Sequence, residues 1–240
     1  MKQTKRKFSI KAIMLFIGRL CIIFVAVSLF FTLLYKFINP PLTPLMAKRF
    51  FEQAFDDKRT IRFERDYVSL DDISPHLVNA VVASEDGKFM MHNGFDWEQL
   101  KLSHERNRKA GGRPVRGGST ISMQTAKNAF LPNHKSYVRK AFEAYFTILI
   151  EYMWGKERIM EVYLNIVEFG DGIYGCEAAS QYYFEKSAKN LTAAEAAQLA
   201  ATLPSPLVRN PDKATPYFKK RANIIRKRAN KVDLTKKIEK

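Results

Sequence analysis

The sequence is poor in cysteine, and this shortage excludes two kinds of stabilising site. Its 240 residues include two cysteines, Cys21 and Cys176, too few for a disulfide framework or a cysteine-rich zinc site. The four histidines form no His-Glu-x-x-His pattern or similar cluster, so a metal site has little support. Runs of alternating apolar and polar residues and internal repeats are also missing. Because 46% of the residues are hydrophobic, we expect one sizeable, mainly α-helical core.

Acidic residues are few beside basic ones. The chain has 24 Asp and Glu against 40 Lys and Arg, a net charge of +16. Most of the excess lies at the ends: residues 1–11 hold five basic and no acidic residues, and residues 219–240 hold ten basic and two acidic ones. This distribution argues against a nucleic-acid groove across the domain, so we expect no nucleic-acid partner. It favours basic tails that meet an anionic surface.

One segment lacks charge altogether. Sixteen uncharged residues separate Arg19 from Lys36, and apolar character extends over residues 12–38. The uncharged run spans roughly 24 Å as a helix, close to the ~30 Å hydrocarbon layer once the flanking basic side chains reach outward. No Ala-x-Ala cleavage site follows, so we predict an uncleaved transmembrane anchor over 12–38. The positive-inside rule makes residues 1–11 a cytoplasmic tail and places the rest of the chain outside.

The segment that follows the anchor, residues 39–66, is amphipathic. Phe50, Phe51 and Phe55 recur at helical spacing beside basic residues. Two interpretations stay open: these rings enter the membrane surface, or they pack in the core.

A second apolar stripe ends on a carboxylate. Ser74 and Pro75 are typical of a helix start, and the valines at 78, 81 and 82 form one face whose next position is Glu85. A carboxylate in that place loses solvation, so we expect its pKa to rise and Glu85 to exchange protons near neutral pH. The alternative is that Glu85 pairs with a buried base.

A basic, glycine-rich stretch lies between Lys101 and Lys127. It contains seven basic residues and one acid, and it lacks both the lysine and the preceding strand of a nucleotide phosphate loop. Ser119 and Thr120 can cap the next helix, so that an anion rests on its N-terminus with Arg116 nearby. A solvated flexible loop is the alternative.

Three more helices are predicted from local signals. Residues 139–154 form an amphipathic helix closed by Gly155, and residues 159–166 form another. Thr192 and Glu195 make a capping box for an alanine-rich helix that Pro204 stops. Glu143 in the first of these helices either serves the chemistry or makes a local pair with Arg139 four residues earlier.

Four segments resemble, in order, the motifs of the peptidoglycan glycosyltransferases, the family 51 transglycosylases. They are EDGKFMMHNGFD at 85–96, GGSTISMQTAKN at 117–128, RKAFE at 139–143 and KERIMEVYLN at 156–165. The similarity covers about residues 67–211, and Met123 departs from the glutamine usual at its position. No Ser-x-x-Lys acylation motif occurs. The resemblance therefore points to the monofunctional form, without a transpeptidase domain.

The resemblance implies a two-lobed, lysozyme-like helical domain at residues 67–218, preceded by one transmembrane helix. The implied reaction joins lipid II to a growing glycan strand through a β-1,4 bond, with inversion, and releases undecaprenyl diphosphate. Glu85 matches the catalytic base, and Glu143 matches a second essential acid that assists the leaving group or orients basic side chains. The residues that it places around the substrate are Asp86, Arg116, Ser119, Thr120, Gln124, Lys127, Lys135 and Arg139.

The resemblance also carries expectations about cofactors and location. A divalent cation, Mg²⁺ or Mn²⁺, could assist the diphosphate, although the sequence offers no dedicated metal ligands. The expected place is the bacterial inner membrane, with the catalytic domain on the periplasmic side, and the expected partners are lipid II, the glycan strand and other wall-synthesis or division proteins. Two alternatives are a lysozyme-like lytic glycosidase and a non-enzymatic membrane-anchored scaffold.

Overall fold

The computed structural model describes residues 10–56, 59–111, 117–134 and 136–234. The chain divides into two compact units, residues 1–38 and residues 39–240. The first unit contains helix α1 (Ile10–Phe37), which includes a window of mean hydropathy 2.6. Among the described residues, α1 is the one helix long and apolar enough to cross a membrane. It is therefore a candidate membrane anchor.

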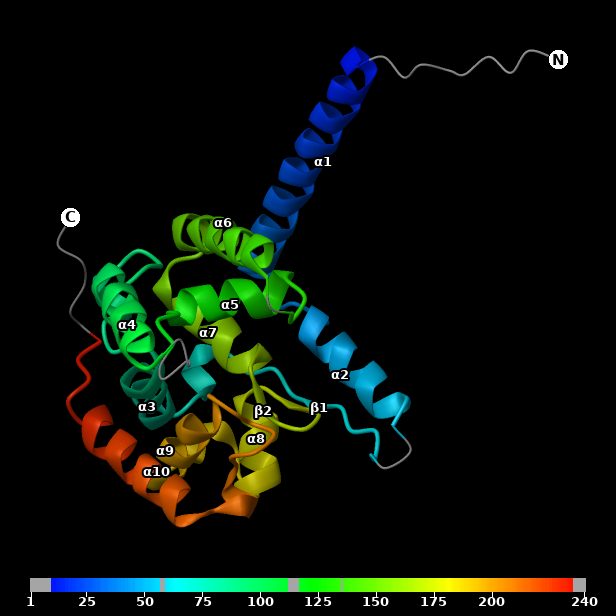
Figure 1. The fold of residues 1–240 in the computed structure, drawn as a ribbon. Coiled ribbons are helices and arrows are strands. Elements are labelled where there is room, and N and C mark those ends of the chain that lie inside the picture. Colours follow the sequence, from blue (N-terminus) through cyan, green and yellow to red (C-terminus); the bar gives the residue numbers. More distant parts are fainter. Residues whose placement is uncertain (1–9, 57–58, 112–116, 135, 235–240) are drawn as a thin grey trace. The chain divides into compact units, whose positions relative to one another are not determined.

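The second unit is built mainly from helices, which confirms the predicted fold class (Figure 1). Its α-helices are α2 (Pro44–Ala54), α3 (Pro75–Glu85), α4 (Trp97–Lys109), α5 (Ile121–Phe130), α6 (Tyr137–Met153), α7 (Lys156–Ile166), α8 (Cys176–Phe184), α9 (Ala193–Thr202) and α10 (Pro216–Ala229). Its short 3-10 turns are η1 (Leu70–Asp72), η2 (Phe89–Met91), η3 (Ala188–Asn190) and η4 (Pro211–Lys213).

A small sheet, which the sequence did not indicate, joins distant parts of this unit. Its strands are β1 (Glu64–Arg65), β2 (Glu168–Gly170) and β3 (Ile173–Tyr174), in the order β1-β3-β2. Strand β1 runs parallel to β3, and β2 runs antiparallel to it. Gly172 makes the turn between β2 and β3 with φ +75°, and a Cβ there would lie 2.2 Å from the Arg62 carbonyl oxygen. Strands of two or three residues are too short to show a period of two.

Two groups of helices enclose the core. Helix α5 packs against α6 and α7, and α9 packs against α3 and α10 (Figure 1). The largest buried side chains include Tyr163, Phe169 and Leu77. Helix α3 belongs to the group with α9 and α10, and its C-terminal residue Glu85 bonds to Gln124 of α5. The candidate site lies at this junction.

The start of α3 follows the sequence signals only in part. Ser74 occupies the N-cap and Pro75 the first turn, as predicted, but the Ser74 hydroxyl donates to the Leu191 carbonyl at 2.9 Å instead of capping. The buried face is Leu77, Ala80, Val81 and Val82, whereas Val78 is only half-buried. The buried face of α3 therefore differs from the predicted one: it includes Leu77 and Ala80, and Val78 belongs to it only in part.

Other local predictions are confirmed, although Gly155 has a different role from the predicted one. Thr192 and Glu195 form the expected capping box of α9. Gly155 lies at the junction after α6 with φ +81°, where it serves as the N-cap of α7. Lys101 and the residues to Lys109 lie on α4, so this part of the basic stretch is helical rather than a loop.

The prediction that residues 219–240 form a basic tail is wrong for residues 219–229, which belong to helix α10. Helix α10 continues to Ala229 and buries Ala222 and Ile225. Its apolar face packs on α9 and α3, because small and branched side chains recur there every three to four residues. The folded unit therefore extends at least to residue 229, beyond the predicted boundary at 218.

Helix α2 is amphipathic, with its phenylalanines on the outside. Leu45 and Met46 are buried, while Phe50, Phe51 and Phe55 are 42%, 58% and 86% exposed. The core-packing interpretation of these three rings therefore does not hold.

Candidate active site

Glu85 is the last residue of α3, and its half-buried carboxylate faces α5. Gln124 Nε2 donates to Glu85 Oε2 at 3.0 Å, and Ser84 Oγ donates to Glu85 Oε1 at 3.1 Å. Both oxygens thus have a donor within the protein, and the side chain still reaches solvent. This arrangement holds a carboxylate ready to accept a proton.

Asp86 connects the end of α3 to the start of α5. Its side chain is buried, and its carboxylate accepts from His92 Nε2 at 2.9 Å and from the Ile121 backbone N–H at 3.0 Å. A negative charge at the first turn of a helix is favourable. His92 Nδ1 is buried and has no hydrogen-bond partner within the described ranges. Asp86, predicted to bind substrate, therefore bonds inside the chain and fixes the position of its neighbour Glu85.

Thr120 and Ser119 also bond within the protein. Thr120 is the N-cap of α5, as predicted: its hydroxyl oxygen accepts from the Met123 N–H at 3.2 Å, and the hydroxyl donates to the Gly94 carbonyl at 2.6 Å. Gly94 has φ +87°, and a Cβ there would lie 2.7 Å from Thr147 Cγ2. Ser119 Oγ accepts from Lys140 Nζ at 3.1 Å. The two hydroxyls hold the start of α5 against the segment that follows η2 and against α6.

Glu143 is a buried carboxylate on α6 with two basic partners. Arg139 Nη1 and Lys140 Nζ each lie 2.5 Å from one of its oxygens. The local pair with Arg139 that the spacing allowed is present. Burying a carboxylate is unfavourable unless it is paired, and here the pairing is complete. Glu143 therefore holds two cations in fixed positions beside Ser119.

Lys127 lies on α5 between the two acidic side chains. Burial lowers the pKa of its ammonium, while the charges of Glu143 and Glu85 act in the opposite direction. Across the part of the chain that the structure describes, Lys127 Nζ has no hydrogen bond or ion pair. A partly buried cation without a partner is suited to bind an anion that comes from outside.

The structure thus brings most of the predicted residues together on α3, α5 and α6. Arg116 and Lys135 lie outside the described residues. Sequence reasoning missed several participants: Ser84, Lys140 and Tyr163 bond directly to this set. Arg221 reaches the set through Ser84, to which it donates. Lys140 and Tyr163 lie within the resembling motifs, which was the available signal, whereas nothing in the sequence pointed to Ser84 or Arg221.

The described residues do not form a resident metal centre. No three His, Cys, Asp or Glu side chains within those ranges are placed to share an ion. Both oxygens of Asp86 are already used by His92 and Ile121.

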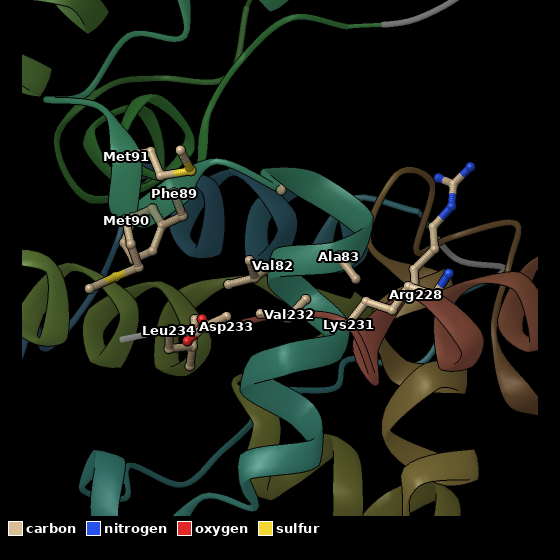
Figure 2. A pocket seen from close by; sticks show the side chains of 11 residues that line it. Val82, Ala83, Phe89, Met90, Met91, Arg228, Lys231, Val232, Asp233 and Leu234 are labelled. Carbon is tan, nitrogen blue, oxygen red and sulfur yellow. The ribbon is translucent and has the colours of Figure 1, made fainter. Parts of the chain in front are cut away.

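A cavity of about 300 Å³ lies away from these groups (Figure 2). It is lined by side chains of α3, η2 and the segment after α10, including Val82, Met90 and Leu234. Neither Glu85 nor Lys127 lines it, so the acid–base and cationic groups face a different side of α3.

Comparisons with known proteins agree with the geometry. The transglycosylase family profile matches residues 54–230. A biosynthetic peptidoglycan transglycosylase of Caulobacter vibrioides is 50% identical over 208 residues, 87% of each chain. One of Bacteroides thetaiotaomicron is 45% identical over 236 residues, 98% of this chain and 94% of the relative. One of Rhodospirillum centenum is 50% identical over 194 residues, 81% of this chain and 80% of the relative. This chain therefore belongs to the transglycosylase family.

Proposed function

We propose that this protein polymerises the glycan strands of peptidoglycan from lipid II and releases undecaprenyl diphosphate. The observation that carries the proposal is the ammonium of Lys127, which has no hydrogen bond or ion pair among the described residues and interacts with the charges of both Glu143 and Glu85. A base and a cation without a bonded partner among the described residues match a transfer in which a hydroxyl loses a proton and a diphosphate departs. Family membership and the printed names of the relatives support the same reaction.

The bond changes follow from the stereochemistry. The donor sugar is α-linked to diphosphate and becomes β-linked, so a single displacement inverts its anomeric carbon. The acceptor 4-hydroxyl oxygen forms a bond to that carbon as the bond to the diphosphate oxygen breaks. Glu85 takes the hydroxyl proton, and the diphosphate leaves with the bonding electron pair. Lys127 offsets the charge that the leaving group gains.

Glu143 serves the reaction through its basic neighbours. Its carboxylate is paired at 2.5 Å with both Arg139 and Lys140, so each of its oxygens already holds a basic side chain. We assign it the second of its two expected roles, that of orienting basic side chains. Arg139 and Lys140 on α6 then act on the diphosphate together with Lys127 on α5, whose ammonium interacts with both of them.

The same proposal places the reaction at a membrane surface. Helix α1 is the candidate anchor, and the positive-inside rule puts the catalytic unit on the periplasmic side of the inner membrane. The exposed rings of Phe50, Phe51 and Phe55 suit contact with lipid. A lipid-linked substrate stays in the bilayer, so an enzyme that uses it must work there.

The direct test is polymerisation of purified lipid II by the full-length protein in detergent, read as glycan polymer on a gel. We expect polymer with the wild type and none with Glu85→Gln. Glu157→Gln, an exposed glutamate on α7, is the matched control and should keep full activity. Release of sugar from purified cell wall without lipid II would favour the lytic alternative. Complementation of a deficient strain by Glu85→Gln would favour the scaffold.

A further inference from the structure

Among the described residues, Tyr163 is the buried phenol that reaches the carboxylate site. It lies on α7 with no exposed surface, and α7 packs against α5. Its hydroxyl is 3.3 Å from Gln124 Oε1, and Gln124 Nε2 is 3.0 Å from Glu85 Oε2. A short chain of hydrogen bonds therefore runs from the core to the proposed base.

The direction of this chain depends on which end of the amide faces Glu85. An amide offers a donor at one end and an acceptor at the other in nearly the same shape. With Nε2 toward Glu85, the amide stabilises the ionised carboxylate. With Oε1 toward Glu85, it stabilises the protonated acid, which must then donate. The orientation of Gln124 and the protonation state of Glu85 are thus linked.

The Tyr163 hydroxyl selects the first orientation. Burial and the charges of Glu85 and Asp86 raise the pKa of Tyr163 well above its ordinary value, so the phenol keeps its proton. Within the described ranges, Gln124 Oε1 is the only acceptor that the hydroxyl has. Turning the amide round would leave a buried O–H without an acceptor, which is unfavourable.

We propose that Tyr163 is a positioning residue that holds the Gln124 amide with its N–H toward Glu85 and so keeps the base ionised. Tyr163 acts through Gln124 and does not touch the substrate. The inference rests on the proposed role of Glu85 as the base. Other groups that face Glu85 or its partners are Ser84, Asp86, Lys127 and Arg221, whose Nη2 donates to Ser84 Oγ at 3.3 Å.

The test is the pH dependence of lipid II polymerisation by Tyr163→Phe, which removes the hydroxyl and keeps the ring. The freed amide can turn and accept a hydrogen bond from protonated Glu85, which favours the acid over the carboxylate. We expect the acid limb of kcat/KM to move up by roughly half to one pH unit. The loss should be roughly 3- to 10-fold on that limb, as for one hydrogen bond, and should shrink at higher pH. KM for lipid II should change less than about twofold, because Tyr163 is buried.

Tyr183→Phe is the matched control, since its hydroxyl also donates one intramolecular bond, to the Phe169 carbonyl at 3.1 Å. Its acid limb should coincide with that of the wild type. Gln124→Leu is the second variant. It should move the limb in the same direction, and adding Tyr163→Phe to it should cause no further shift. If Tyr163→Phe loses its helical circular dichroism signal, the position of the acid limb in Gln124→Leu alone tests the inference.

An acid limb that stays in place in Tyr163→Phe or in Gln124→Leu overturns the inference, as does full additivity of the two changes. A wild type that makes no polymer from lipid II refutes the proposed function instead. The two failures are therefore distinguishable.

Discussion

Replacing Lys127 by methionine should stabilise the free protein and impair its function. Methionine keeps the length of the side chain and removes the charge. Burial lowers the pKa of Lys127 in the folded chain, so the folded state disfavours the ammonium relative to the unfolded state. Each pKa unit of lowering corresponds to about 1.4 kcal/mol of destabilisation, which the substitution removes.

The direction of the pKa shift of Lys127 determines the pH range in which the substitution stabilises the protein. Below the lowered pKa of the folded chain, Lys127 is charged in both states, and the full penalty is present. As pH rises through that pKa toward the ordinary value of lysine, the folded state releases its proton and the penalty fades. The unfolding midpoint of Lys127→Met should therefore exceed that of the wild type at neutral pH, by roughly 2–4 °C per kcal/mol for a unit of this size. The difference should narrow at alkaline pH.

Lipid II binding and turnover, in contrast, should decrease in the Lys127→Met protein. One charge-assisted contact with the diphosphate is worth about 1.5–3 kcal/mol, so lipid II binding should weaken roughly 10- to 150-fold, and turnover should fall as well. A lipid-linked monophosphate should lose less affinity than the diphosphate. Thermal unfolding and lipid II binding of the full chain in one detergent provide both measurements.

Lys140→Met is the matched control on the neighbouring helix. Lys140 pairs with the buried Glu143, so its removal leaves a carboxylate with one partner fewer and should lower the unfolding midpoint. A Lys127→Met protein that is less stable than the wild type at neutral pH would contradict the destabilising effect of the buried ammonium. Unchanged lipid II binding would refute its role at the diphosphate.

Three further changes test the site and its surroundings. Glu85→Gln should slow polymerisation at least ~100-fold while lipid II binding persists; activity within about tenfold of the wild type would exclude Glu85 as the base. Changing Phe50, Phe51 and Phe55 together to serine, in a protein without residues 1–38, should reduce vesicle binding and polymerisation in parallel while circular dichroism stays helical. Loss of helix in that variant would show that the three rings are needed for folding and would contradict their proposed contact with lipid. Asp86→Asn should lower stability by about 1–3 kcal/mol in thermal unfolding and slow polymerisation, and an unchanged midpoint would contradict its bonding role.

Local signals in the sequence predicted those parts of the fold that neighbouring residues decide. The capping box of Thr192 and Glu195, the Ser74-Pro75 helix start and the i,i+4 pair of Arg139 with Glu143 all involve residues close along the chain. Such interactions depend on helix geometry alone. For the same reason, the stripe that ends on Glu85 could be found without knowing the fold.

Interactions between distant segments could not be predicted in this way. Gln124 meets Glu85 across 39 positions of sequence, and Arg221 meets Ser84 across 137. Strand β1 pairs with β3 through two residues each, which leaves no periodic signal. The boundary inside α10 was missed because its many basic residues concealed a narrow apolar face that only α9 and α3 complete.

The charges of the site show why this fold suits an anionic substrate. Glu143 compensates Arg139 and Lys140, and Asp86 compensates the helix start at Ile121. Among the described residues of the site, Lys127 is left as the cation without a partner. A buried unpaired charge lowers stability, so a chain selected for stability alone would replace it with an apolar residue. The penalty makes physical sense if an anion from outside completes the pair. The diphosphate of the proposed reaction would do so best in the transition state, where its charge grows.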